Sequence, residues 1–121
     1  MEETTTGFAD AKAFSDARLA AFQRGGVKTV LGMYRDDAVI ITPQGNVQGA
    51  AISAMMIALF DEFAQPGVSF ELLSRSEAGD VANFVWRART QNNEYDFCAE
   101  TYVLKDGKIA VQTFAGQIRP R

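Results

Sequence analysis

The second half of the chain alternates strand-like segments with short turns, and this pattern limits the possible folds more than any other feature. The segments are rich in β-branched and aromatic residues and cover residues 68–76, 81–90, 94–104 and 109–118. The last connection, Lys105-Asp106-Gly107-Lys108, has the Asp-Gly composition of a tight hairpin turn. Parallel neighbours would need long crossovers, so the pattern predicts an antiparallel meander of four strands.

The first half of the chain predicts helices that cover such a sheet. Residues 10–24 and 50–63 carry apolar side chains at three- and four-residue spacing, and a shorter helix is expected over residues 27–34. A short β-branched strand is expected over residues 38–42, with a return strand at Val47-Gln48, and Arg35-Asp36-Asp37 is expected to form a polar corner. The predicted order α-α-β-β-α-β-β-β-β is an α+β fold in which a strongly curved sheet can enclose a cavity.

Composition excludes several kinds of chemistry. The 121 residues include no histidine, which rules out Ser-His-Asp and Cys-His catalysis as well as histidine metal sites. Cys98 is the only cysteine, so neither an internal disulfide nor a thiolate zinc site is available. The net charge is −3 and the basic residues are scattered, which disfavours nucleic acid as a partner. We therefore expect no metal and no cofactor.

The polar residues 1–7 at the chain end predict a disordered tail. The length of the chain predicts one domain, over residues 8–121. No apolar run approaches the roughly 18 residues that a membrane span needs. The polar N-terminus also lacks the basic start and apolar stretch of a signal peptide. These features predict a cytoplasmic protein with no membrane partner.

Several short phrases resemble one family of small domains. Residues 34–40 (YRDDAVI) resemble the junction between the second helix and first strand of the nuclear-transport-factor-2-like superfamily. Pro43-x-Gly45 followed by Gly49-Ala50-Ala51-Ile52 resembles its turn and third-helix entry, and Asp106-Gly107-Lys108-Ile109 resembles its last hairpin. The resemblance covers residues 10–118 and is strongest to SnoaL-like and ketosteroid-isomerase-like proteins. It implies a cone of curved sheet and three helices, with an apolar pocket and a homodimer through the sheet face.

The resemblance to ketosteroid isomerase also implies three polar positions. Thr42 stands where that enzyme has its general base, and a threonine hydroxyl cannot take over this role at neutral pH. Arg18 stands in place of a tyrosine that stabilises the oxyanion, and Glu100 keeps the carboxyl group of the second oxyanion donor. Steroid isomerisation by the family's mechanism is therefore not expected.

Period-two alternation places Glu100 on the same face of its strand as Cys98, Tyr102 and Leu104, which suits the interior. Arg18 lies within the apolar stripe of the first helix, four residues from both Phe14 and Phe22. An ion pair between Arg18 and Glu100 across the cavity, structural or ligand-binding, is one interpretation. The other interpretation is that the charged end of Arg18 reaches water and that Glu100 lies at a dimer interface or a sheet edge.

Aromatic and methionine side chains supply the expected pocket wall, although core packing explains such residues equally well. The expected lining comprises Phe14, Phe22, Thr42, Met55, Met56, Phe60, Phe84, Trp86, Tyr102 and Phe114. We expect the chain to bind a small, mostly apolar molecule there. Whether it is an enzyme stays open; its chemistry would be isomerase- or cyclase-type proton transfer, with Glu100 and Arg18 as the catalytic pair.

Two alternatives remain at this stage. One is a non-catalytic association module whose cone is filled by its own side chains and which dimerises through the sheet. The other is an epoxide hydrolase of the limonene type, which the family resemblance ties to an Asp-Arg-Asp cluster in the pocket. A measured pocket volume and the polar atoms that reach it would separate these hypotheses.

Overall fold

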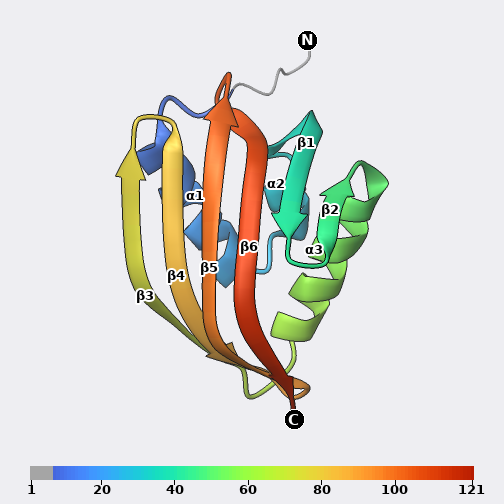
Figure 1. Ribbon diagram of the computed structural model, residues 1–121. Coiled ribbons are helices and arrows are strands. Elements are labelled where there is room, and N and C mark those ends of the chain that lie inside the picture. The colour runs from blue at the N-terminus through green and yellow to red at the C-terminus, as the bar shows by residue number, and fades with distance from the viewer. Residues whose placement is uncertain (1–6) are drawn as a thin grey trace.

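Six strands form one curved, open sheet, and three helices pack against it, in the computed structural model, which describes residues 7–121 (Figure 1). The helices are α1 (Ala11–Gln23), α2 (Val27–Leu31) and α3 (Ala50–Phe63). The strands are β1 (Tyr34–Thr42), β2 (Gly45–Gln48), β3 (Ser69–Ala78), β4 (Val81–Arg89), β5 (Asn93–Lys105) and β6 (Lys108–Pro120). The predicted α+β cone and its order of elements are confirmed.

The sheet combines the expected meander with a parallel edge. Its strand order is β2-β1-β6-β5-β4-β3, and β3 to β6 are antiparallel neighbours. Strand β1 pairs with β6 in parallel and with β2 in antiparallel orientation. The register between β5 and each of its neighbours shifts near Tyr95–Phe97, and such bulges bend a strand. The curvature that follows brings one face of the sheet around the space beneath the helices.

The junction between α2 and β1 differs from the sequence prediction. The helix expected over residues 27–34 ends at Leu31, and β1 begins at Tyr34. The expected polar corner at residues 35–37 is therefore part of a strand. Arg35 stabilises this extended segment by pairing with Asp37 at 2.8 Å and with Asp106 at 3.2 Å. Pairing with a distant strand thus outweighs the local helical pattern.

Local signals fix the helix ends. Asp10 caps α1 by accepting a hydrogen bond from the Ala13 backbone N–H at 2.9 Å. Gly25 follows this helix with a φ of 70°, as the left-handed stop after α1 requires. No helix in the described part of the chain is long and apolar enough to cross a membrane.

The expected tail at residues 1–7 lies outside the described residues except for Gly7. Gly7 packs directly against the turn between β5 and β6, where an added Cβ would clash with the Asp106 carbonyl oxygen. The next backbone N–H, of Phe8, donates to the Gly107 carbonyl oxygen at 2.8 Å. Gly7 therefore belongs to the folded structure and not to the tail.

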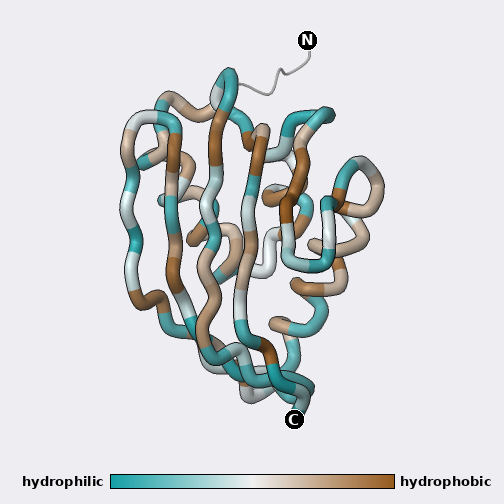
Figure 2. The backbone as a smooth tube through the Cα atoms, in the orientation of Figure 1, coloured by the Kyte–Doolittle hydropathy of each residue, from teal (hydrophilic) through white to brown (hydrophobic). Residues whose placement is uncertain are grey.

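The core lies between the helices and the concave face of the sheet. Alternating side chains of each central strand point into it, and Figure 2 shows the corresponding changes between apolar and polar residues along the strands. On β4 the inward side chains are Ala82, Phe84, Trp86 and Ala88. The same alternation on β5 turns Cys98, Tyr102 and Leu104 inward. Any polar residue in this register is carried toward the interior as well.

Candidate functional site

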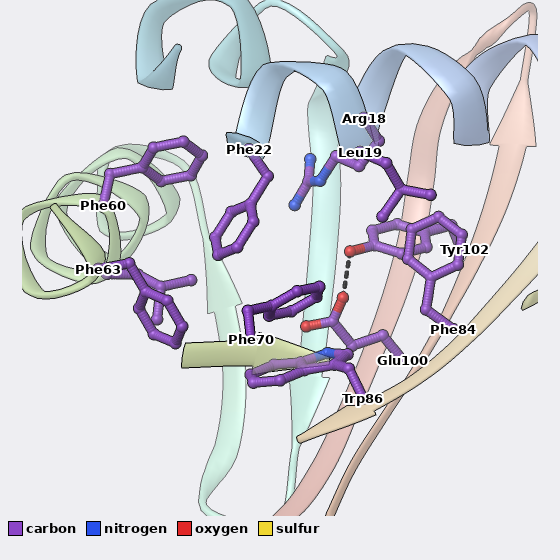
Figure 3. A pocket seen from close by; sticks show the side chains of 11 residues that line it. Arg18, Leu19, Phe22, Phe60, Phe63, Phe70, Phe84, Trp86, Glu100 and Tyr102 are labelled. Carbon is purple, nitrogen blue, oxygen red and sulfur yellow. Dashed lines mark hydrogen bonds between the residues drawn. The ribbon is translucent and has the colours of Figure 1, made fainter. Parts of the chain in front are cut away.

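A pocket opens into the interior of the cone between α1, α3 and strands β3 to β5. Figure 3 shows its side chains converging from the two helices and the sheet. It is lined by Arg18, Leu19, Phe22, Leu59, Phe60, Phe63, Phe70, Phe84, Trp86, Glu100 and Tyr102. The lining is therefore apolar and mostly aromatic, with one arginine and one carboxyl group.

Arg18 lies on α1, on the helix side of this pocket. Ser15, Ala21 and Phe14 share its buried helix face, and the Arg18 side chain itself is only 8% exposed. Arg18 Nη2 donates a hydrogen bond to Tyr34 Oη at 3.0 Å. Tyr34 Oη in turn donates to Gln112 Oε1 at 2.5 Å, so a buried polar chain runs from the helix to β6.

Two tyrosine rings also hold the Arg18 guanidinium. Its central carbon lies 5.4 Å from the ring centre of Tyr34 and 5.0 Å from that of Tyr102, within the range of cation–π interactions. Burial alone lowers the pKa of Arg18, but Tyr102, Tyr34 and Glu100 together raise it above its usual value. Arg18 is therefore a permanent positive charge inside an apolar interior.

The second terminal nitrogen of Arg18 has no partner. Nη1 is buried and forms no hydrogen bond with any described residue. A buried N–H group without an acceptor costs roughly 1–3 kcal/mol, and more when the group is charged. Because Arg18 lines the pocket, an acceptor that enters this space could satisfy Nη1.

Strand β5 delivers Glu100 to the opposite wall. The alternation that turns Tyr102 inward also places the Glu100 side chain, partly buried, against the pocket. Its carboxyl group accepts a hydrogen bond from Tyr102 Oη. Burial raises the pKa of Glu100; the Arg18 charge and hydrogen bonding by Tyr102 and Trp86 oppose this effect without cancelling it. The carboxyl group is therefore easier to protonate than an ordinary glutamate.

Arg18 and Glu100 point into the same space from opposite sides (Figure 3). The direct ion pair that was one interpretation of the sequence does not form among the described residues, because Arg18 Nη2 donates to Tyr34 and Glu100 accepts from Tyr102. Both residues therefore border one cavity without forming a salt bridge to each other.

Aromatic rings fill most of the remaining interior. Phe22 contacts Phe60, Phe63 and Phe70 at ring-centre distances of 5.4, 5.3 and 5.2 Å. Phe70 also contacts Trp86 at 5.5 Å. The cavity that remains has a volume of about 50 Å³, whereas pockets for drug-sized ligands start near about 300 Å³. The expected ligand-sized space is therefore not open in this structure, and on volume alone the filled interior matches the association-module alternative. A larger ligand requires ring movement.

Five of the ten expected lining residues border the pocket: Phe22, Phe60, Phe84, Trp86 and Tyr102. Phe14 lies instead in the closed core, where it packs against Tyr102 at a ring-centre distance of 5.0 Å. Met56 lies behind Arg18, with its sulfur 3.8 Å from Nη2. Phe114 packs against the core from β6 without bordering the pocket.

Thr42 and Met55 lie away from this pocket. The Thr42 hydroxyl donates to the Gly45 carbonyl oxygen at 2.8 Å and closes the turn between β1 and β2. The position that corresponds to the isomerase base is therefore structural here. Met55 is 37% exposed on the outer side of α3, because the apolar stripe of that helix is wider than the face it buries.

Sequence reasoning missed several residues around the site. Tyr34 was expected in a helix, and Gln112 and Phe70 were not singled out. Glu62 was also missed: its carboxylate accepts hydrogen bonds from Thr90 (2.5 Å), Asn93 (2.9 Å) and Tyr95 (2.7 Å). These bonds tie the end of α3 to the turn between β4 and β5. Only the three-dimensional fold brings these partners together, so no local spacing signals them.

Other chemistry finds little support at this site. Burial raises the pKa of Cys98 to about 12, which makes its thiol a poor nucleophile. Among residues 7–121, no group of three or more histidine, cysteine or carboxylate side chains is placed to hold a metal ion. The described pocket lining contains one carboxyl group and one arginine, so the Asp-Arg-Asp cluster of a limonene-type epoxide hydrolase is not formed.

Comparison with known proteins gives a family match. Residues 16–112 match the family described as the SnoaL-like domain. These residues include both Arg18 and Glu100. No curated protein matches the sequence.

Solved structures share the fold at low sequence identity. AclR from Streptomyces galilaeus, a proposed hydroxylase, is 18% identical and covers 88% of this chain and 87% of its own, with a TM-score of 0.71. A proposed ketosteroid isomerase from Kribbella flavida is 12% identical over 87% of this chain and 76% of its own, with a TM-score of 0.69. A proposed isomerase of the SnoaL-like family from Agrobacterium tumefaciens is 20% identical over 85% of this chain and 93% of its own, with a TM-score of 0.62. At these identities the similarity establishes the fold alone.

Proposed function

Because this chain belongs to the SnoaL-like domain family, we propose that it binds a small, mostly apolar molecule between Arg18 and Glu100. The observation that carries the proposal is that Arg18, which lines an apolar pocket, has a buried Nη1 with no hydrogen-bond partner among the described residues. An unsatisfied charged donor in the interior lowers the stability of the protein. A purely structural role therefore does not explain why Arg18 is found at this position. A ligand oxygen would supply the missing acceptor.

The wall predicts the shape of the ligand. Phe22, Phe70 and Trp86 offer flat apolar surfaces, which suit a planar ring or a short hydrocarbon. Since the closed cavity holds only about 50 Å³, entry requires rotation of rings at the mouth. Phe22 and Phe63 are the candidates, because both are partly buried and lie at the ends of α1 and α3.

Proton transfer is the chemistry that these two polar groups support. Ionised Glu100 can take a proton from the carbon beside a carbonyl group, while Arg18 stabilises the negative charge that develops on the carbonyl oxygen. Glu100 can then return the proton to a different carbon, which completes an isomerisation without a cofactor. The raised pKa of Glu100 makes it a stronger base than an ordinary carboxylate.

Trp86 offers a direct binding assay, because it is the only tryptophan of the chain and borders the pocket. We expect its fluorescence to change saturably when small aromatic ketones, alcohols or acids are added. The same ligands should raise the melting temperature, since a ligand at 100 times its Kd adds about 2.7 kcal/mol of stability.

A matched pair of variants locates the binding site. Phe22→Ala removes a ring from the pocket wall, whereas Phe97→Ala removes one that is 54% exposed on the outer face of the sheet. Binding should respond to the first substitution and not to the second. Absence of binding by every probe, or a response to Phe97→Ala alone, would contradict the proposed site.

A second candidate function is association with another copy through the outer sheet face. Phe97, Val81 and Val103 expose 54%, 38% and 37% of their surfaces there, and Val81 pairs directly with Val103. A second copy that covered this face would remove these apolar side chains from water. Sedimentation velocity should then detect a dimer that Phe97→Asp converts to a monomer; a wild-type protein that stays monomeric at high concentration argues against it.

A further inference from the structure

Arg18 is buried and has no carboxylate partner among the described residues, whereas the other two arginines without one, Arg24 and Arg121, are exposed. Five arginines in the described part of the chain pair with a carboxylate at 3.2 Å or less: Arg35, Arg75, Arg87, Arg89 and Arg119. All of these have more accessible side chains than Arg18, which is 8% exposed. The most deeply buried of these six positive charges is thus the one without a direct counterion.

The side chains that contact Arg18 directly carry no carboxylate. Tyr34 and Tyr102 contact it with a hydroxyl group and ring faces. The one carboxyl group that borders the described pocket, Glu100, is bonded to Tyr102 instead, and burial favours its protonated form. Arg18 therefore brings a positive charge to the lining of the pocket, and Nη1 is its terminal nitrogen without a hydrogen-bond partner among the described residues.

We propose that the ligand of this pocket is a small apolar carboxylic acid, bound as its anion with one oxygen on Arg18 Nη1. The inference rests on the proposed function and narrows its ligand class. A neutral carbonyl group would satisfy the donor but leave the buried charge uncompensated, and a cation would be repelled. An anion bound beside Glu100 favours the protonated form of this carboxyl group, which can then donate a hydrogen bond to the second carboxylate oxygen. The apolar body lies against Phe22, Phe70 and Trp86.

Matched acids and amides test this ligand class. Benzoate, phenylacetate and cinnamate, each paired with its neutral amide, have the same apolar body with and without a charge. Titration of the wild-type protein at pH 7.5, followed by Trp86 fluorescence and calorimetry, should give at least about tenfold tighter binding for an acid than for its amide, the usual scale for a charge-assisted hydrogen bond.

Variants identify the residue responsible. Arg18→Met should remove the preference for the acid, and Arg18→Lys, which keeps a charge without the planar guanidinium, should retain part of it. Arg87→Met removes an exposed arginine that pairs with Glu71 at 2.7 Å and should leave the preference intact.

The outcomes distinguish the proposed ligand class, an apolar acid, from the proposed function, binding of a small apolar molecule. If amides bind in the pocket as tightly as their acids, or Arg18→Met keeps the preference, the inference is wrong and the proposed function stands. If no compound binds, both fail. Circular dichroism of each variant establishes that it is folded. If Arg18→Met does not fold, the acid preference of Arg18→Lys tests the inference instead.

Discussion

Glu100→Gln is the most informative single substitution, because it changes the charge of the pocket while preserving its shape. Glutamine keeps an oxygen that can accept the hydrogen bond from Tyr102 Oη. The substitution therefore removes the ionisation of Glu100 and little else. Its effect on the free energy of unfolding should depend on pH in a direction that the surroundings of the side chain determine.

Burial raises the pKa of Glu100 above its unfolded value. The folded state then binds the proton of Glu100 more tightly than the unfolded state does. The stability contributed by this group is therefore fully present below its unfolded pKa, near 4.5. This stability is lost as the pH rises through the folded pKa. Each unit of upward shift corresponds to about 1.4 kcal/mol.

Urea denaturation of both proteins between pH 4.5 and pH 8.5 measures this effect. We expect the stability of Glu100→Gln relative to wild type to increase with pH and to reach a plateau above the folded pKa of Glu100. The height of the plateau divided by 1.4 kcal/mol gives the shift in pH units. Glu71→Gln, at an exposed carboxylate on β3, is the control and should not reproduce this profile. A Glu100→Gln profile parallel to that of wild type at every pH refutes the reasoning.

Three further predictions concern the frame of the pocket. Glu62→Gln should lower the free energy of unfolding by about 1–3 kcal/mol, because the glutamine N–H groups would face the hydrogen-bond donors that now bind the carboxylate. The pKa of Glu62 is lowered in the folded protein, so wild type loses this stabilisation as the pH falls through the folded pKa. Urea denaturation at several pH values should therefore show a smaller difference between the two proteins at acidic pH. Asp10→Ala removes the hydrogen bond to the Ala13 N–H and should cost about 1 kcal/mol, measured by thermal unfolding. Gly107→Ala should lower the free energy of unfolding by more than about 1 kcal/mol in the same assay, because φ is 77° and the new Cβ would lie 2.5 Å from the Gly7 Cα. Unchanged stability of the Asp10 or the Gly107 variant would contradict the contact described for that residue.

The sequence predicts most of the fold because the local signals agree with one another. The Asp-Gly turn at residues 106–107 and the two periodicities, of helix and strand, each point to the observed elements. The prediction fails at residues 32–37, where a helix-like apolar pattern and two aspartates suggest a helix end and a corner. There the parallel pairing with β6 decides the structure, and that partner is distant in the sequence.

The candidate site is less accessible to sequence reasoning. Alternation along β5 places Glu100 inward, and an arginine within an apolar helix stripe draws attention to Arg18. The partners of Arg18, however, come from β1 and β6, and no spacing in the sequence connects them. The size of the cavity depends on how Phe22, Phe63 and Phe70 pack, which composition does not determine.

A crystal structure grown with 4-bromobenzoate tests the central claim most directly, because anomalous scattering from bromine locates the ring without ambiguity. The account predicts bromine among Phe22, Phe60 and Phe63, with a carboxylate oxygen within hydrogen-bond distance of Arg18 Nη1. Bromine found only on the outer face of the sheet, or an interior that stays closed at a saturating concentration, would contradict it.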